Sequence, residues 1–187
     1  GELQAGKKTS LNDVKRAISS CAGNANLSVF NAANADPNYH GMGTTLVVGV
    51  LQNEHFVIGH IGDSRAYLLR GDTLKLITKD HSMLQEQIDA GLITPEQAQF
   101  AANKNLVTRT VGVDAYVETE IHEHAVQAGD IFLFCSDGLN DMISDSEIAE
   151  VLKNRNISLQ ARASALIDAA NAAGGRDNIS VLLVHAQ

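Results

Sequence analysis

The segment that most constrains the fold is residues 131–135, Ile-Phe-Leu-Phe-Cys, which is apolar at every position. Such a short run predicts a strand buried on both faces, because a strand with one exposed face alternates apolar and polar side chains. The 187 residues are enough to cover it, since a fold of this size buries about 70% of the surface of its unfolded chain. We therefore expect a single domain over residues 1–187, built in layers around this strand.

Two patterns follow one another in the first half of the chain. Residues 10–35 place apolar side chains at spacings of three and four, which predicts an amphipathic helix that ends at Asp36-Pro37-Asn38. Short segments rich in β-branched residues come next, separated by turn formers, and we expect them to form an antiparallel meander. These segments are residues 44–51, 55–61, 66–69 and 74–77.

The second half of the chain repeats both patterns. Helical segments are predicted over residues 82–90, from residue 94, over 144–152 and over 158–173, and Ser or Thr at the N-cap position introduces the last three. Strands are predicted over residues 117–125, 131–135 and 178–185. Blocks of strands flanked by separate helices favour an α+β fold of antiparallel sheets with helices packed outside.

Charge and cysteine content exclude several functions. The 14 Lys and Arg against 22 Asp and Glu give a formal net charge of −8, which argues against a nucleic-acid or anionic-membrane binder. No apolar run approaches the ~20 residues needed to span a bilayer. The two cysteines, Cys21 and Cys135, are too few for a disulfide framework. We expect both to be buried thiols of a cytoplasmic protein.

Three aspartates lie at predicted strand ends and near glycines. Asp63 follows the 55–61 strand, Asp137 follows the apolar strand, and Asp177 precedes the last strand. Carboxylates gathered at the rim of a core repel one another unless a cation neutralises them, and oxygen ligands favour Mg²⁺ or Mn²⁺. The alternative is a generic antiparallel-sheet domain in which these aspartates only form turns. The seven histidines and two cysteines show no zinc-ligand spacing.

Six short segments identify a resemblance that covers residues 10–185. In chain order they are Gly41-Met42-Gly43-Thr44-Thr45, Gly62-Asp63-Ser64-Arg65, Asp80-His81-Ser82, Thr108-Arg109-Thr110-Val111-Gly112, Cys135-Ser136-Asp137-Gly138-Leu139 and Gly174-Gly175-Arg176-Asp177-Asn178. Their order and intervals resemble those of the type 2C (PPM) metal-dependent serine/threonine protein phosphatases, and most of all the bacterial branch.

The resemblance implies a fold, a reaction and a set of metal ligands. The fold would be an αββα sandwich of two packed antiparallel sheets flanked by helices, with a flap over residues 83–107. The reaction would be hydrolysis of phosphoserine and phosphothreonine in proteins by metal-activated water, on targets of a serine/threonine kinase. Asp137 and Asp177 match the catalytic ligands of two Mn²⁺ or Mg²⁺ ions, and Asp63 with Asp137 matches the ligands of a third.

The chain also departs from the family pattern. Neither the Arg-x-x-Asn-Glu-Asp stretch nor the Asp-Gly-Met-Gly-Gly motif of the family occurs in residues 1–187, so we expect the N-terminal strands of the domain to be missing here. The phosphate-binding residue is therefore unknown. The alternative function is a non-catalytic binding or regulatory module on the same fold, either a pseudophosphatase or an inactive fragment. We expect structural roles for five other polar residues: Arg65, Arg109, Arg176, His60 and His81.

Overall fold

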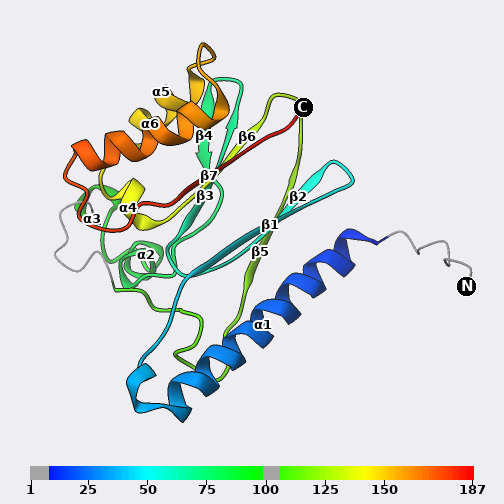
Figure 1. The fold of residues 1–187 in the computed structure, drawn as a ribbon, viewed down its shortest axis with the longest axis vertical. Coiled ribbons are helices and arrows are strands. Elements are labelled where there is room, and N and C mark those ends of the chain that lie inside the picture. Colours follow the sequence, from blue (N-terminus) through cyan, green and yellow to red (C-terminus); the bar gives the residue numbers. More distant parts are fainter. Residues whose placement is uncertain (1–8, 99–105) are drawn as a thin grey trace, which may run out of the picture. The chain divides into compact units, whose positions relative to one another are not determined.

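The computed structural model describes residues 9–98 and 106–187. Their contacts divide the chain into two compact units. Unit 1 comprises the chain up to Ile61 together with residues 110–125, and unit 2 comprises residues 62–109 and 126–187. Figure 1 labels the elements of both units.

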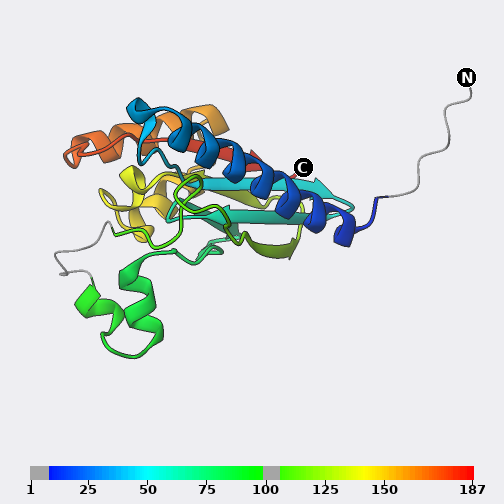
Figure 2. The same cartoon turned by 90° about the horizontal axis from the view of Figure 1, so that it is seen from below.

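In the described residues, unit 1 consists of one long helix, a short 3-10 helix and a three-stranded antiparallel sheet. The sheet has the order β1-β2-β5, with β1 at Leu46–Gln52, β2 at His55–Ile61 and β5 at Glu120–Ala125. Helix α1 (Leu11–Ala35) begins at a capping box and ends before the short 3-10 helix η1 (Pro37–Tyr39). It runs along one face of this sheet (Figures 1 and 2).

The buried stripe of α1 differs from the apolar stripe expected from the sequence. Val14, Ile18, Ala22 and Asn26 are buried at successive intervals of four. Cys21 lies beside this stripe and is exposed, so the expectation that it is a buried thiol was wrong. The polar Asn26 takes part in the stripe because its side chain donates to the carbonyl of Asp114 and accepts from the backbone N–H of Gly112.

The described part of unit 2 contains a four-stranded antiparallel sheet and five helices. The strand order is β4-β3-β6-β7, with β3 at Arg65–Arg70, β4 at Thr73–Leu76, β6 at Ile131–Cys135 and β7 at Val181–His185. The helices are α2 (Met83–Asp89), α3 (Pro95–Ala98), α4 (Asp137–Asn140), α5 (Asp145–Lys153) and α6 (Leu159–Ala172). Figure 1 shows α5 and α6 side by side over this sheet.

The core of unit 2 forms between its sheet and helices α5 and α6. Tyr67 and Leu133 of the sheet pack with Ile148 and Leu152 of α5 and with Leu166 of α6. All five residues of β6 are buried, which confirms that this strand is covered on both faces. The expected α+β class, two antiparallel sheets flanked by helices, is also confirmed.

The expected meander was wrong at one connection. Strand β2 pairs with β1 and β5, whereas β3 pairs with β4 and β6, so β2 and β3 belong to different sheets. The chain leaves the first sheet at Ile61 and turns at Gly62, whose φ of 105° is a conformation that favours glycine. Asp63 therefore lies in a crossover between sheets and not in a hairpin.

Helix α4 was not predicted from the sequence, whereas the longer helices agree with their expected ranges. None of the helices in the described residues combines the length and the apolar character that a membrane span requires.

Candidate metal centre and active site

Strand register brings Asp63 and Asp137 to the same end of the unit 2 sheet. Arg65 at the start of β3 pairs with Cys135 at the end of β6. Two residues farther out on each strand are Asp63 and Asp137, so the antiparallel register places them opposite one another. Both carboxylates therefore leave a pair of well-buried central strands at one rim.

This rim opens into an acidic cavity of about 660 Å³. Five aspartates line it, and Arg65 is the one cation among the described lining residues. The aspartates are Asp63, Asp80, Asp137, Asp141 and Asp145. The cavity is thus suited to a positively charged occupant.

The pKa of Asp63 is raised by its burial and by the negative charges around it. Burial and, next to it, the charge of Asp137 raise the pKa of Asp63 from 3.8 to about 6. Asp80 and Asp141 act in the same direction. A carboxylate in this position costs free energy when it ionises unless a cation shares the site.

Asp137 is held by the first turn of α4. Its Oδ1 accepts from the backbone N–H of Gly138 at 2.8 Å, and its side chain is partly buried. Gly138 packs directly against the peptide of Asn178, where a Cβ atom would overlap the Asn178 carbonyl group. This close approach explains why a glycine must follow Asp137.

Asp177 is not gathered into the cavity with the other two aspartates. It is exposed, its Oδ1 accepts from the backbone N–H of Asn178 at 2.7 Å, and it is not a lining residue. The segment that follows Asp177 is nevertheless hydrogen-bonded to the residue before Asp137. Ser136 Oγ donates to the Asn178 carbonyl at 2.8 Å and accepts from the backbone N–H of Ser180 at 2.9 Å.

Arg65 is committed to an ion pair in the cavity wall. Its Nε and Nη2 donate to the carboxylate of Asp80, the shortest contact being 2.7 Å, and its Nη1 donates to Tyr67 Oη. The Tyr67 hydroxyl in turn donates to Asp145 at 3.1 Å. These contacts are consistent with the structural role that we expect for Arg65.

His81 supports the turn that carries Asp63. Its Nδ1 accepts from the backbone N–H of Gly62 at 3.1 Å, and Nε2 lies 3.2 Å from Nη1 of Arg109. The structural roles proposed for His81 and Arg109 agree with these contacts.

The proposed flap supplies one wall of the cavity. Leu84, Gln85 and Ile88 of α2 and Pro95 and Ala98 of α3 line it. Figure 2 shows the two helices lying next to each other. Residues 99–105 of the proposed 83–107 flap lie outside the described residues.

The carboxylates of the cavity suit a hard divalent cation, and the nearby Cys135 thiol does not suit the role of a nucleophile. Carboxylate oxygens are the donors that Mg²⁺ and Mn²⁺ prefer. Burial raises the pKa of the Cys135 thiol to about 12, so this residue is not a thiolate at neutral pH. Sequence reasoning missed Asp80, Asp141 and Asp145 as part of the cavity. The available signal for Asp141 was its position four residues after Asp137.

The family pattern described as protein phosphatase 2C matches residues 2–173. The serine/threonine phosphatase stp of Listeria welshimeri is 41% identical over 152 residues, which are 81% of this chain and 60% of that protein. The protein phosphatase PhpP of Streptococcus pneumoniae is 40% identical over 149 residues, 80% of this chain and 60% of its own length. The chain thus spans about 60% of the length of these relatives.

Solved structures agree with the sequence comparison. The serine/threonine phosphatase of S. agalactiae is 32% identical with a TM-score of 0.91, and the match covers 96% of this chain and 73% of that one. The catalytic domain of the phosphatase PstP, in complex with two manganese ions, is 33% identical with a TM-score of 0.81 over 100% of this chain and 75% of its own. The chain belongs to the protein phosphatase 2C family.

Proposed function

We propose that the acidic cavity of unit 2 hydrolyses phosphoserine and phosphothreonine in proteins with the help of Mn²⁺ or Mg²⁺. The observation that carries the proposal is that Asp63 and Asp137 face one cavity, where burial and the charge of Asp137 together raise the pKa of Asp63 to about 6. Membership of the protein phosphatase 2C family and a relative with two bound manganese ions support the same reaction.

Each aspartate has a proposed role. Asp137 and Asp177 would hold two catalytic ions, and Asp63 with Asp137 would hold a third. Divalent ions held there would lower the pKa of a bound water and neutralise charge on the phosphoryl oxygens. For Asp177 this role requires a rotation of its exposed side chain, because its backbone is already fixed beside the Asp137 loop.

The remaining cavity residues would shape and polarise the site. With five aspartates against one paired arginine, the bare cavity repels a phosphate group that carries about −1.5 to −2 charges. Binding of substrate would therefore depend on the loaded metals. The wall formed by α2 and α3, as part of the 83–107 flap, would contact the protein that bears the phosphate.

The substrates and location are part of the same proposal. We propose that the substrates are proteins phosphorylated by a serine/threonine kinase, and that the reaction takes place in the cytoplasm. The two free thiols, Cys21 and Cys135, suit a reducing compartment. The formal charge of −8 argues against nucleic acid or an anionic membrane as a partner.

Phosphate release from a phosphothreonine peptide tests the proposal, measured with the chain and with the longest natural protein that contains it. Mn²⁺ should stimulate release, and Asp137→Asn should lower it by about 100-fold or more, since loss of a group that merely supports a metal ligand costs 10–100-fold. Asp72→Asn is the matched control, because Asp72 also has a glycine as its sequence neighbour but lies in the exposed β3–β4 turn. It should leave the rate unchanged.

Two results would contradict catalysis at this site. If Asp137→Asn left the rate of phosphate release unchanged, the reaction would not take place at this cavity. Absence of turnover in the longest natural protein, with Mn²⁺ still bound, would support the alternative of a non-catalytic binding or regulatory module.

A further inference from the structure

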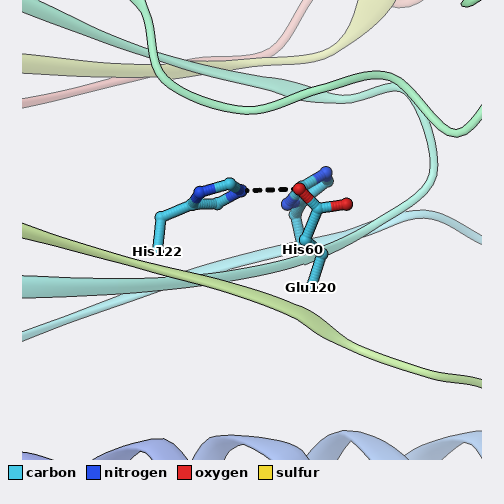
Figure 3. Close-up of side chains that lie close together, drawn as sticks. All are labelled: His60, Glu120 and His122. Atoms are coloured by element: carbon cyan, nitrogen blue, oxygen red, sulfur yellow. Dashed lines mark ion pairs between the residues drawn. The ribbon is translucent and has the colours of Figure 1, made fainter. Parts of the chain in front are cut away.

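A second group of metal-ligating side chains lies in unit 1, apart from the aspartate cavity of unit 2. His60 of β2 and Glu120 and His122 of β5 each offer one ligand atom, and these atoms all lie within 4.8 Å of one another. Figure 3 shows the three side chains together on the face of the sheet that points away from α1. Among the described residues, this is the only set of three potential ligands that meets this distance.

Strand pairing explains why the three side chains meet. His60 lies directly opposite Glu120 in the β2–β5 register, and His122 is two residues farther along β5, on the same face. His60 and His122 are therefore diagonal neighbours, with ring centroids 5.5 Å apart. One rigid antiparallel pair thus positions two imidazoles and one carboxylate.

The spacing of the ligand atoms suits a small transition-metal ion. Zinc binds imidazole nitrogen at about 2.0–2.1 Å, so tetrahedral ligands stand about 3.3 Å apart. Nε2 of His122 already lies 3.0 Å from Oε1 of Glu120. Closing the remaining separations from at most 4.8 Å requires only small side-chain rotations.

Burial gives the group a sheltered side and an open side. The His60 side chain is fully buried, whereas those of His122 and Glu120 are 28% and 34% exposed. Ile58, which lies opposite His122, is also fully buried. Nε2 of His122 is itself buried, so an ion would reach the group past the partly exposed Glu120 side chain. It would then be bound next to an apolar neighbour, where electrostatic attraction is stronger than in water.

We propose that His60, Glu120 and His122 form a zinc-class metal site that joins β2 to β5. Two imidazoles and a carboxylate are a ligand set found in zinc proteins, with a fourth position left for water. Imidazole donors favour such an ion over the Mg²⁺ or Mn²⁺ expected at the all-carboxylate cavity. The site is independent of the proposed phosphatase reaction, and its effect is to stabilise the sheet of unit 1.

Zinc binding to shape-conserving variants tests the site. The affinity of the full chain for Zn²⁺ would be measured by competition with a chromophoric chelator, for the parent and for Glu120→Gln and His122→Gln. Each substitution removes one ligand and should weaken binding at this site by about 100-fold or more, because supporting groups alone contribute 10–100-fold. Zn²⁺ should also raise the Tm of the parent more than that of either variant.

His55→Ala is the matched control for adventitious histidine binding. His55 lies on β2 as well, but on the opposite face, where its Nε2 is 3.7 Å from Glu123. The proposal expects parental Zn²⁺ affinity in this variant. Co²⁺ provides a second readout, since imidazole ligation in the parent should give a visible absorption band that is lost in His122→Gln.

Three outcomes would overturn the proposal. Parental Zn²⁺ affinity in both Glu120→Gln and His122→Gln would show that the group is only a polar pair within the sheet. Equal weakening by His55→Ala would indicate nonspecific binding to histidines. Loss of zinc affinity together with loss of the folded far-UV spectrum in metal-free buffer would assign a purely structural role to these side chains.

Discussion

Asp63 is the residue at which stability and the proposed function oppose one another. Its pKa is raised because burial and the charge of Asp137 disfavour its ionised form. Asp63→Asn removes that repulsion at neutral pH, so the metal-free variant should be more stable than the parent. The gain should be on the order of 1 kcal/mol, because Asp63 is only half-buried and solvent screens the repulsion. Urea unfolding with EDTA present measures it, and a loss of stability would contradict the account.

The same pKa shift sets a pH dependence. The folded pKa of about 6 lies above the unfolded value near 3.8, so the folded chain binds more protons between these values. The contribution of Asp63 to the free energy of unfolding, taken as the difference between the metal-free parent and Asp63→Asn, should therefore fall as the pH rises from about 4 to about 6. Mn²⁺ affinity should rise through the same interval as the competing proton leaves. Calorimetry of unfolding and of Mn²⁺ binding at pH 4 and pH 6 tests both trends, and Asp63→Asn should show a smaller rise in Mn²⁺ affinity.

At the residue scale, prediction from the sequence succeeded where neighbouring residues determine the backbone conformation. It failed where a side chain's burial depends on partners far away in the sequence. The glycine beside Asp137 could be anticipated as a site of close approach, and the structure shows the Asn178 peptide against it. The exposed Cys21 could not, because the buried stripe of α1 passes through the polar Asn26. Hydrophobic periodicity alone does not predict a buried helix face that includes an asparagine.

At the scale of elements, the turn from β6 into α4 depends on the absence of a side chain at Gly138. Gly138→Ala should destabilise unit 2 by about 1–3 kcal/mol, as over-packing usually does, and should displace the Asp137 loop. Gly23→Ala is the control, since no atom lies within 4 Å of the added Cβ in the middle of α1. That variant should gain about 0.5–1 kcal/mol. Denaturant unfolding measures both changes in the free energy of unfolding. A gain for Gly138→Ala together with a loss for Gly23→Ala would contradict this interpretation.

The ion pair between β3 and the following segment is a second element-scale test. The side chains of Arg65 and Asp80 are 25% and 15% exposed, so Asp80→Asn leaves a largely buried guanidinium without its counter-charge. We expect a loss of about 3 kcal/mol or more. Asp89→Asn breaks the neighbouring but exposed pair with Lys79 and should cost less than about 1 kcal/mol. Thermal unfolding tests this comparison. Equal losses of stability in Asp80→Asn and Asp89→Asn would contradict the idea that burial makes the Arg65–Asp80 pair the more important one.

Most elements could be predicted from the sequence, but their pairing could not. Capping residues at Ser144 and Ser158 mark helix starts that the structure confirms. The turn at Gly62 looked like a hairpin, because a two- to four-residue loop between β-rich segments is compatible with either a hairpin or a crossover. Only the observed register shows that β3 pairs with β6 and thereby places Asp63 opposite Asp137.

At the scale of the whole molecule, the proposed reaction acts on an anionic group although the chain itself is strongly acidic. The formal charge of −8 and the five cavity aspartates both repel phosphate, so the proposed reaction requires bound cations. Family membership could be anticipated from six ordered segments, and the comparisons confirm it. The ligand roles of Asp63, Asp137 and Asp177 stay predictions, since the exposed Asp177 carboxylate lies outside the cavity lining.

The most direct measurement of the central claim is anomalous diffraction from crystals of this protein soaked in manganese, recorded at the manganese absorption edge. The account predicts anomalous peaks within coordinating distance of Asp63 and Asp137, with the Asp177 side chain turned towards them. Peaks absent from this rim, with the three carboxylates pointing into separate solvent regions, would contradict it.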